Sequence, residues 1–528
     1  MRLAPLVAIA VALPGCHSKE GASQGSPCAS AHDCGGGLVC VAGACAGAAA
    51  KVGACAAGAP RLVGGAAIVA PDPGTTCATA IMPAAPSVNV QALGQHTVGE
   101  RLSFDVPAGT WSVSIVSQAV PGTTKDAVYA GSVVLPNSVV PTDVRAPDGR
   151  LFYTDLPADQ PSDRSGYPDY TGFLAYYGGL TPVSGSFTFP NTSAGLDVVR
   201  SSKGGLPAGA WTMTVNDLAA ECLVAGCSGG SATGKYDVQV VTRAGPSPFA
   251  SAGTLDFDVY LAASDPAVAV STPLLAADAP TRPDLQRLFT SLGTVLASAG
   301  LCVGTVTFHD LPDWARTRYA SVNVDATGPC DDLSQLFTLA QAPSASVHLF
   351  LVDDLTETSG SQKYRVVGID GSIPGPSGVP GTINGGTVVP VWDLGHGQCG
   401  SAIDVARCGS DRMAYIAAHE AGHWLGLYHT TERYGSLFDP LSDTPACRCS
   451  VCAPLTDRAS CAENAPRDSS TSHPAEPVSM IGDWCARDGS PDCGGAQNLM
   501  FWLLDDARSR GALSPQQAEV MRLNPAVR

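Results

Sequence analysis

Residues 417–434 read AAHEAGHWLGLYHTTERY, a stretch in which histidines recur at regular spacing around one glutamate. On a helix, His419 and His423 are four residues apart, so their side chains lie on the same face, one turn apart. Two neutral imidazoles on one helical face can bind one Zn²⁺ ion. Glu420 follows the first of these histidines and can reach a water molecule at the metal as a general base. The spacing therefore predicts a helix that carries a zinc site.

Gly426 and His429 extend the pattern beyond the helix. Glycine adopts positive φ at little cost, so the chain can turn sharply at Gly426 and return His429 as a third ligand. The fourth position on the metal would then be left for water. Histidine makes up only 10 of 528 residues, so this combination rarely arises by chance. The alternative is a helix with ordinary surface or core histidines, and the combined spacing disfavours it.

The spacing HExxHxxGxxH resembles that of the metzincin zinc peptidases. The longer match consists of HEAGHWLGLYHT at 419–430, SDTP at 442–445 and NLM at 498–500. It resembles the pappalysin-like (ulilysin-like) branch of that family, here on a chain that begins like a bacterial lipoprotein. This resemblance covers about the last half of the chain.

The resemblance implies roles for individual residues of the motif. His419, His423 and His429 would hold the catalytic zinc ion, with Glu420 as the catalytic base. Met500 would form the Met-turn, which is the apolar floor beneath the three histidines.

Two further implications concern residues after the motif. Asp439, Asp443 and Thr444 lie where pappalysin-like enzymes bind calcium, which implies a Ca²⁺ site there. Several relatives place a tyrosine two residues after the Met-turn methionine, whereas this chain has Trp502. An indole cannot ligate zinc as a phenolate does, so no step assisted by a tyrosine is expected.

Residues 1–16 read MRLAPLVAIAVALPGC and resemble a bacterial lipoprotein signal peptide. Arg2 supplies the positive start, and the apolar run after it is too short to span a bilayer. We predict that Cys16 is the acylated new N-terminus, which would anchor the protein at the cell envelope, with the outer membrane favoured. Pro14 is unusual in a lipobox, so ordinary secretion with cleavage nearby is the alternative. Both routes predict an exported protein.

The charge balance limits the partners of this protein. The 30 Lys and Arg residues against 47 Asp and Glu give a formal net charge of −17. This charge disfavours nucleic acids and anionic lipid surfaces, so we expect protein or peptide substrates and a membrane contact through the lipid alone. Charged residues make up 15% of the chain, whereas Gly and Pro number 58 and 41, which favours loop-rich β structure over long helices.

The cysteine count also indicates export. The chain has 19 cysteines, and lipidation of Cys16 would leave an even number, which in an oxidising compartment predicts a full set of disulfides. Local pairs are expected for Cys222 with Cys227 and for Cys399 with Cys408. A loop-rich segment at 430–497 holds six more cysteines, for which disulfides are favoured over a second zinc site.

Composition and patterning divide the chain into four parts. Residues 1–16 form the signal peptide, and residues 17–85 a Cys-rich segment followed by an Ala/Gly/Pro-rich tether. Residues 87–245 alternate apolar and polar residues between turn signals, which predicts an all-β, jelly-roll-like sandwich. Residues 250–528 would form an α+β metzincin metallopeptidase domain with a mixed twisted sheet and a zinc-binding active-site helix. The predicted fold class is therefore multidomain.

Apolar patterns predict the elements of the last part. Strands are expected at residues 255–261, 302–308, 347–352, 366–369 and 388–391. A helix should open at Pro283, and Pro390 should lie at or near a sheet edge. The glycine-rich stretch 368–386 is interpreted as an irregular loop near the rim of the cleft, and the active helix should run from about residue 411 to residue 427. His348 is interpreted as a core histidine.

These observations together predict an exported zinc-dependent metalloendopeptidase. Glu420 would take a proton from the zinc-activated water and pass it to the leaving amine. One alternative is an adhesion or binding lipoprotein with a vestigial zinc site, but a purely structural site needs no base. Another is a zinc hydrolase of a non-peptide amide. In metzincins an edge strand above the cleft pairs with the substrate backbone, which favours peptides.

Overall fold

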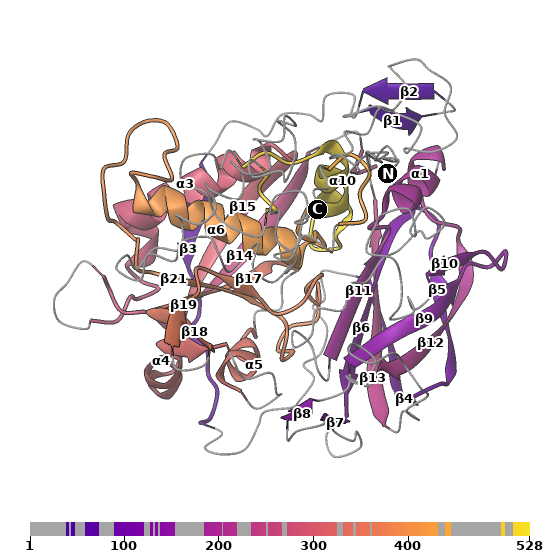
Figure 1. Ribbon diagram of the computed structural model, residues 1–528, viewed down its shortest axis with the longest axis horizontal. Helices are drawn as coiled ribbons and strands as arrows, with labels where there is room; N and C mark the ends of the chain where they lie inside the picture. Colours follow the sequence, from indigo (N-terminus) through magenta and orange to yellow (C-terminus); the bar gives the residue numbers. More distant parts are fainter. Residues whose placement is uncertain are drawn as a thin grey trace, which may run out of the picture.

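The computed structural model of the chain (Figure 1) describes residues 38–41, 44–47, 59–72, 89–120, 127–129, 133–135, 138–153, 184–202, 204–218, 234–245, 247–249, 252–266, 272–324, 331–341, 345–359, 362–430, 439–444, 498–501 and 511–528. Within these ranges, no helix combines the length and apolar character needed to cross a membrane. Predictions for Cys16, the Cys222–Cys227 pair, the six cysteines of 430–497 and Trp502 concern positions outside the described residues. The molecule is a mixed α/β protein with several sheets and few helices.

Residues 89–245, called here the two-sheet unit, form two antiparallel sheets that face each other. One has the order β10 (Leu151–Tyr153), β9 (Ser138–Arg145), β12 (Gly209–Leu218), β5 (Arg101–Val106), and the other β11 (Ser184–Phe189), β6 (Thr110–Ala119), β13 (Lys235–Ala244), β4 (Asn89–Thr97). Alternate residues of β5 are buried, as expected for a strand with one face on a core. Trp211 stacks on Phe189 of the opposite sheet with 5.4 Å between ring centroids.

Shorter elements accompany this unit. They are the hairpins β1 (Leu38–Val41) with β2 (Ala44–Gly47) and β7 (Ala127–Tyr129) with β8 (Val133–Leu135), and helix α1 (Ser193–Ser201). Helix α1 begins at its N-cap residue Thr192, whose side chain accepts a hydrogen bond from the backbone N–H of Gly195.

A six-stranded sheet, called here the mixed sheet, carries the C-terminal half. Its order is β20 (Ile369–Asp370), β21 (Thr387–Pro390), β17 (Val347–Val352), β14 (Gly253–Leu261), β15 (Leu301–Asp310), β3 (Arg61–Gly64). All neighbours are parallel except β20, which runs antiparallel to β21. The strand predicted at 347–352 is confirmed, and the strands predicted at 255–261 and 302–308 begin within two residues of their predicted starts.

The two faces of the mixed sheet bury different partners. Leu349 and Leu351 of β17 belong to the apolar cluster that contains α3 (Pro283–Ala297) and α6 (Gly409–Trp424). Phe350 and Val352, which point the other way, belong to a second cluster. That cluster includes residues of α4 (Asp313–Tyr319), α5 (Asp332–Phe337), β16 (Ser321–Asn323) and β18 (Asp354–Ser359). Strands β16 and β18 form a small three-stranded sheet with β19 (Gln362–Arg365). A 3₁₀ turn, η3 (Ala279–Thr281), precedes α3.

The predicted tether at 17–85 is wrong for residues 61–64. These residues form β3, which pairs in parallel with residues 305–308 of β15 as the outermost strand of the mixed sheet. The side chain of His309 contacts the carbonyl oxygen of Ala66 at 3.0 Å, and Trp314 Nε1 donates to Ala70 O at 2.9 Å. Four residues between glycines and alanines carry no readable period, so only the free edge of β15 shows why this segment is a strand.

The glycine-rich stretch is irregular as predicted, and most of it is buried. Residues 374–391 are buried throughout. Ser186 of the two-sheet unit donates to the carbonyl oxygen of Gly375 at 3.2 Å, and Val379 packs with valines of β6 and β13. The predicted strand at 366–369 is largely wrong, because β20 begins at Ile369. Pro390 lies beyond the last residue that β20 pairs, so its missing N–H costs no ladder bond on that side.

Helix α10 (Pro515–Leu523) lies between the two-sheet unit and the mixed sheet (Figure 1). Ser112 Oγ donates to the carbonyl oxygen of Leu523, and Arg243 Nε donates to Val527 O at 2.9 Å. Arg200 of α1 donates from Nε to Glu519 Oε2 at 3.0 Å. One continuous set of buried apolar side chains includes residues of both units. The two units therefore share an interior.

Candidate metal centre

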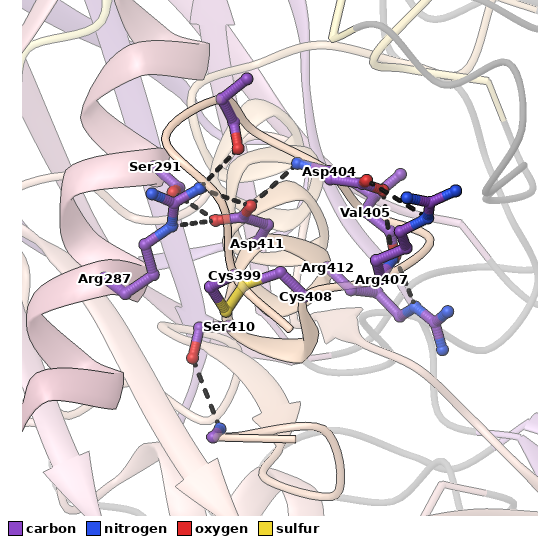
Figure 2. The surroundings of a disulfide bond; sticks show 12 residues. Arg287, Ser291, Cys399, Asp404, Val405, Arg407, Cys408, Ser410, Asp411 and Arg412 are labelled. Atoms are coloured by element: carbon purple, nitrogen blue, oxygen red, sulfur yellow. Dashed lines mark hydrogen bonds and ion pairs between the residues drawn. A yellow bond between two sulfur atoms is a disulfide. The ribbon is translucent and has the colours of Figure 1, made fainter. Parts of the chain in front are cut away.

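Helix α6 begins with a set of polar contacts that fix its first turn (Figure 2). The buried carboxylate of Asp411 accepts hydrogen bonds from Arg287 Nε at 2.6 Å, Ser291 Oγ at 2.6 Å and the backbone N–H of Asp404 at 2.8 Å. Arg287 and Ser291 belong to α3, so these bonds join the two helices. The predicted Cys399–Cys408 disulfide is confirmed and closes the loop before the helix. Helix α6 spans 409–424, slightly earlier than predicted.

Three histidines converge at the other end of α6. The Nε2 atom of His423 lies 3.1 Å from that of His419 and 3.0 Å from that of His429, and the third separation is 3.2 Å. Two nitrogen ligands at about 2.0–2.1 Å from one tetrahedral zinc ion would lie about 3.3 Å apart. Among the described residues, these three histidines are the one group of three or more His, Cys, Asp or Glu side chains whose ligand atoms lie close enough to hold a metal.

Hydrogen bonds on the far side of the His419 and His423 rings show that their converging Nε2 atoms present lone pairs. His419 Nδ1 lies 2.6 Å from the carbonyl oxygen of Leu499, and His423 Nδ1 lies 2.7 Å from that of Leu427. A carbonyl oxygen only accepts, so each Nδ1 carries the proton and each Nε2 of these neutral rings does not. Lone pairs brought this close repel each other unless a cation lies between them. The triad therefore fits a metal ion.

The pKa values of these rings agree with neutral ligands. Burial, together with the neighbouring His429, lowers the pKa of His419 to about 3. Burial, together with the neighbouring His429 and His419, holds the pKa of His423 well below its usual range. Both imidazoles are therefore free to ligate a metal at neutral pH.

The turn after α6 brings the third histidine back. Gly426 has φ of 107°, a left-handed conformation that favours glycine. Its N–H donates to His423 O at 2.8 Å, and the N–H of Leu427 donates to Gly422 O at 2.9 Å, so the helix ends in a tight loop. This confirms the exit predicted at Gly426.

Met500 lies beneath the helix at the level of the triad. It is fully buried, and its sulfur would lie 2.5 Å from a Cβ atom placed on Gly422. The N–H of Thr430 donates to Met500 O at 3.0 Å, next to His429 in the sequence. The turn at 498–501 thus supports two of the three histidines, one through Leu499 O and the other through this backbone bond.

Glu420 is buried beside the triad, with 6% of its surface exposed. Burial raises the pKa of Glu420 to about 8, and a bound cation would oppose this shift by favouring the carboxylate. A Cβ atom on Gly368 would lie 2.6 Å from Glu420 Oε1, so the chain entering β20 passes directly over the carboxylate.

Asp370 is a neighbour of Glu420 that the sequence did not reveal. It is buried on β20, and burial together with the charge of Glu420 holds its pKa well above the usual range. Its Oδ2 accepts from the N–H of Ser372 at 3.2 Å, and its Oδ1 has no hydrogen-bond partner among the described residues. A carboxylate in the glycine-rich stretch, directly after the strand predicted at 366–369, was the available signal, but nothing in the sequence connects it with α6.

The residues predicted to bind calcium take part in hydrogen bonds with other protein groups. Thr444 Oγ1 donates to Asp439 Oδ1 at 2.5 Å. Asp443 accepts from Ser514 Oγ at 2.7 Å and from the N–H of Gln516 at 2.9 Å, so it caps the start of α10. A calcium site at these residues stays a prediction.

Two histidines outside the motif lie away from the triad. His348 is buried on β17, as interpreted, with its Nδ1 2.9 Å from Gly385 O. His309 on β15 lies 2.8 Å from Asp258 Oδ1 and supports the mixed sheet rather than a metal.

Comparisons with known proteins add little to this geometry. No family model and no curated protein matches the chain. Metalloproteinase-II from Bacteroides fragilis is similar with 15% identity and a TM-score of 0.20, over 36% of this chain and 49% of that chain, so the chain spans about half the length of that structure. A family two carbohydrate esterase from Cellvibrio japonicus is similar with 9% identity and a TM-score of 0.11, over 53% of this chain and 67% of that chain. Scores this low carry no argument, so function is argued from the site.

Proposed function

We propose that this protein is a zinc-dependent metalloendopeptidase of the metzincin, pappalysin-like type, with the zinc ion held by His419, His423 and His429. The convergence of three imidazole Nε2 atoms within 3.2 Å, with Glu420 buried beside them, carries this proposal. An all-nitrogen set of three ligands with a fourth position open is typical of catalytic rather than structural zinc sites.

A bound zinc ion would act as a Lewis acid, which would lower the pKa of a water molecule to near neutral pH and polarise the substrate carbonyl. Glu420 accepts a proton from the attacking water while the oxygen of that water bonds to the carbonyl carbon. Glu420 then gives this proton to the amide nitrogen as the C–N bond breaks, which releases a carboxylate and an amine. His419 and His423 keep their protons on Nδ1, bound to backbone carbonyls, and serve as ligands only.

A peptide substrate is favoured by the strand next to the base. Among the described strands, β20 is the outermost of the mixed sheet on the side of α6 and pairs only with β21. Its backbone leads from Gly368, which lies over Glu420. An extended peptide pairing with this edge would place its backbone amides near the base, a form of β-augmentation.

Two substitutions separate the base from the ligands. Glu420→Gln should keep zinc bound but reduce hydrolysis of a quenched fluorescent peptide library about 10²–10⁴-fold, because an amide cannot accept the proton. His423→Ala should lose zinc and activity together. Elemental analysis of the purified proteins beside the peptide assay measures both effects. Full activity in Glu420→Gln, or a wild-type protein that lacks zinc and ignores chelators, would refute the proposal.

We also propose that the protein is exported and anchored by a lipid on Cys16, which the leader sequence supports. Cys16→Ser should then release the protein from the membrane fraction and leave it without an acyl group in N-terminal mass spectrometry. A wild-type protein that is soluble and unacylated at this residue would overturn the anchor.

A further inference from the structure

The turn at 498–501 lies between the metal centre and helix α10. Its Leu499 carbonyl oxygen lies 2.6 Å from His419 Nδ1, so a displacement of the turn would rotate or release this ring. The N–H of Leu499 donates to Ala512 O at 2.7 Å, just before α10. What holds this turn in place therefore also orients a metal ligand.

Asn498 shapes the turn from within. Its Oδ1 accepts from the N–H of Met500 at 2.8 Å, a local bond that bends the backbone. The same side chain forms a reciprocal amide pair with α10. Asn498 Nδ2 donates to Gln517 Oε1 at 2.8 Å, and Gln517 Nε2 donates to Asn498 Oδ1 at 3.3 Å. Gln517 is fully buried, and 8% of Asn498 is exposed, so water does not compete for these bonds.

Gln517 is itself fixed by the start of its helix. Its Oε1 accepts from the N–H of Ser514 at 2.9 Å, and its own N–H donates to Ser514 Oγ at 3.1 Å, which completes a capping box. The preceding residue, Gln516, accepts from Ser193 Oγ of α1 at 2.5 Å. The ion pair between Arg200 of α1 and Glu519 lies one turn further on. Helix α10 is thus held on α1 at two points, and the bond from Ser112 to Leu523 holds its end on the two-sheet unit as well.

From this series of contacts we infer that Gln517 is a positioning residue of the metal centre, which transmits the fixed position of α10 through Asn498 and Leu499 to His419. The inference rests on the proposed binding of metal by the triad. Hydrogen-bond partners behind a metal-ligating histidine typically change metal affinity or activity about 10–100-fold when removed. Gln517 acts one step further out, since it holds the turn that supplies the partner.

Gln517→Glu is the sharpest test, because it separates the two roles of this side chain. A glutamate at this position still accepts from Ser514 and Asn498, so the capping box is kept. It loses the donor to Asn498 Oδ1 and places a second oxygen against that atom. Asp331→Ala, which removes the N-cap side chain of α5 on the other face of the mixed sheet, is the control for a general loss of stability.

The measurement is the rate of zinc transfer from the folded holoprotein to a colorimetric chelator, together with the visible spectrum of the Co²⁺-substituted protein. Gln517→Glu should release zinc about 10-fold faster than wild type and shift the Co²⁺ bands, whereas Asp331→Ala should change neither. Asn498→Asp removes the Nδ2 donor on the turn side and should also speed zinc release and shift the Co²⁺ bands. This variant replaces Gln517→Glu as the test if Gln517→Glu does not fold. Wild-type release and spectrum in the folded variants would overturn the inference. A wild-type protein that binds neither metal would refute the proposed function instead.

Discussion

Gly368 and Gly422 occupy places where a side chain would enter the metal centre. A Cβ atom on Gly368 would lie 2.6 Å from Glu420 Oε1 and 2.7 Å from Ile416 Cγ2. A Cβ atom on Gly422 would lie 2.5 Å from Met500 Sδ. Neither residue has a positive φ, so the lack of space rather than the backbone conformation requires glycine.

Gly368→Ala should therefore displace the Glu420 carboxylate or the start of β20. We expect kcat/KM on peptides to fall by about 10²-fold, because a displacement on the order of 1 Å at a catalytic group has this effect. Zinc content should stay at the wild-type level, since no ligand moves. The control is Gly400→Ala, at an exposed position where a Cβ atom meets no atom within 4 Å. An unchanged kcat/KM in Gly368→Ala would show that the base tolerates the extra methyl group.

Helix α6 is held at both ends by different chemistry. Its start is fixed by the Asp411 carboxylate and the disulfide-closed loop before it (Figure 2). Its end is fixed by the turn around Met500. Burial alone would raise the pKa of Asp411, but hydrogen bonds from Arg287, Ser291 and the N–H of Asp404 outweigh it and lower the pKa below its ordinary value of 3.8. The folded state therefore prefers the charged carboxylate.

A lowered pKa in the folded state gives stability that is complete above the unfolded pKa and is lost as the pH falls through the folded pKa. We expect Asp411→Asn to reduce the free energy of unfolding by about 2 kcal/mol at pH 7, the range for hydrogen bonds to a charged group. The difference in free energy of unfolding between the two proteins should shrink as the pH falls below 3.8, the ordinary pKa of an aspartate. Urea unfolding of both proteins over a pH series measures this difference. A difference that does not depend on pH would contradict the assignment.

The two-sheet unit and the mixed sheet pack against each other through shared apolar clusters. Val116 of β6, Val241 of β13 and Val379 of the buried glycine-rich stretch share one apolar cluster. The buried pair Arg200–Glu519 and the bond from Arg243 to Val527 cross the same boundary. Separation of the units would expose these valines to water, which costs free energy because apolar surface is no longer buried.

We therefore expect thermal unfolding of the oxidised, metal-loaded protein to be a single transition. Differential scanning calorimetry should give a ratio of calorimetric to van't Hoff enthalpy near one, as for a cooperative unit. Two separate peaks would show that the shared interior contributes little. The same conclusion would follow if residues 250–528 alone gave a stable and active protein.

The sequence by itself determined the local part of the metal centre. His419 and His423 lie on one face because a helix repeats every 3.6 residues, and Gly426 turns the chain because glycine accepts a positive φ. The Cys399–Cys408 pair was readable because its partners are close in the chain. The strand at 347–352 was readable because burial on both faces makes it nearly all apolar.

Only the tertiary structure decided the contacts between distant segments. Residues 61–64 became a strand because β15 had an unpaired edge, and the glycine-rich stretch became interior because the two-sheet unit packs on it. Asp370 beside Glu420 and Gln517 behind Asn498 have the same origin. Hydrogen bonds and charge interactions act over a few ångströms of space, so a single sequence shows them only where neighbours in the chain are also neighbours in the fold.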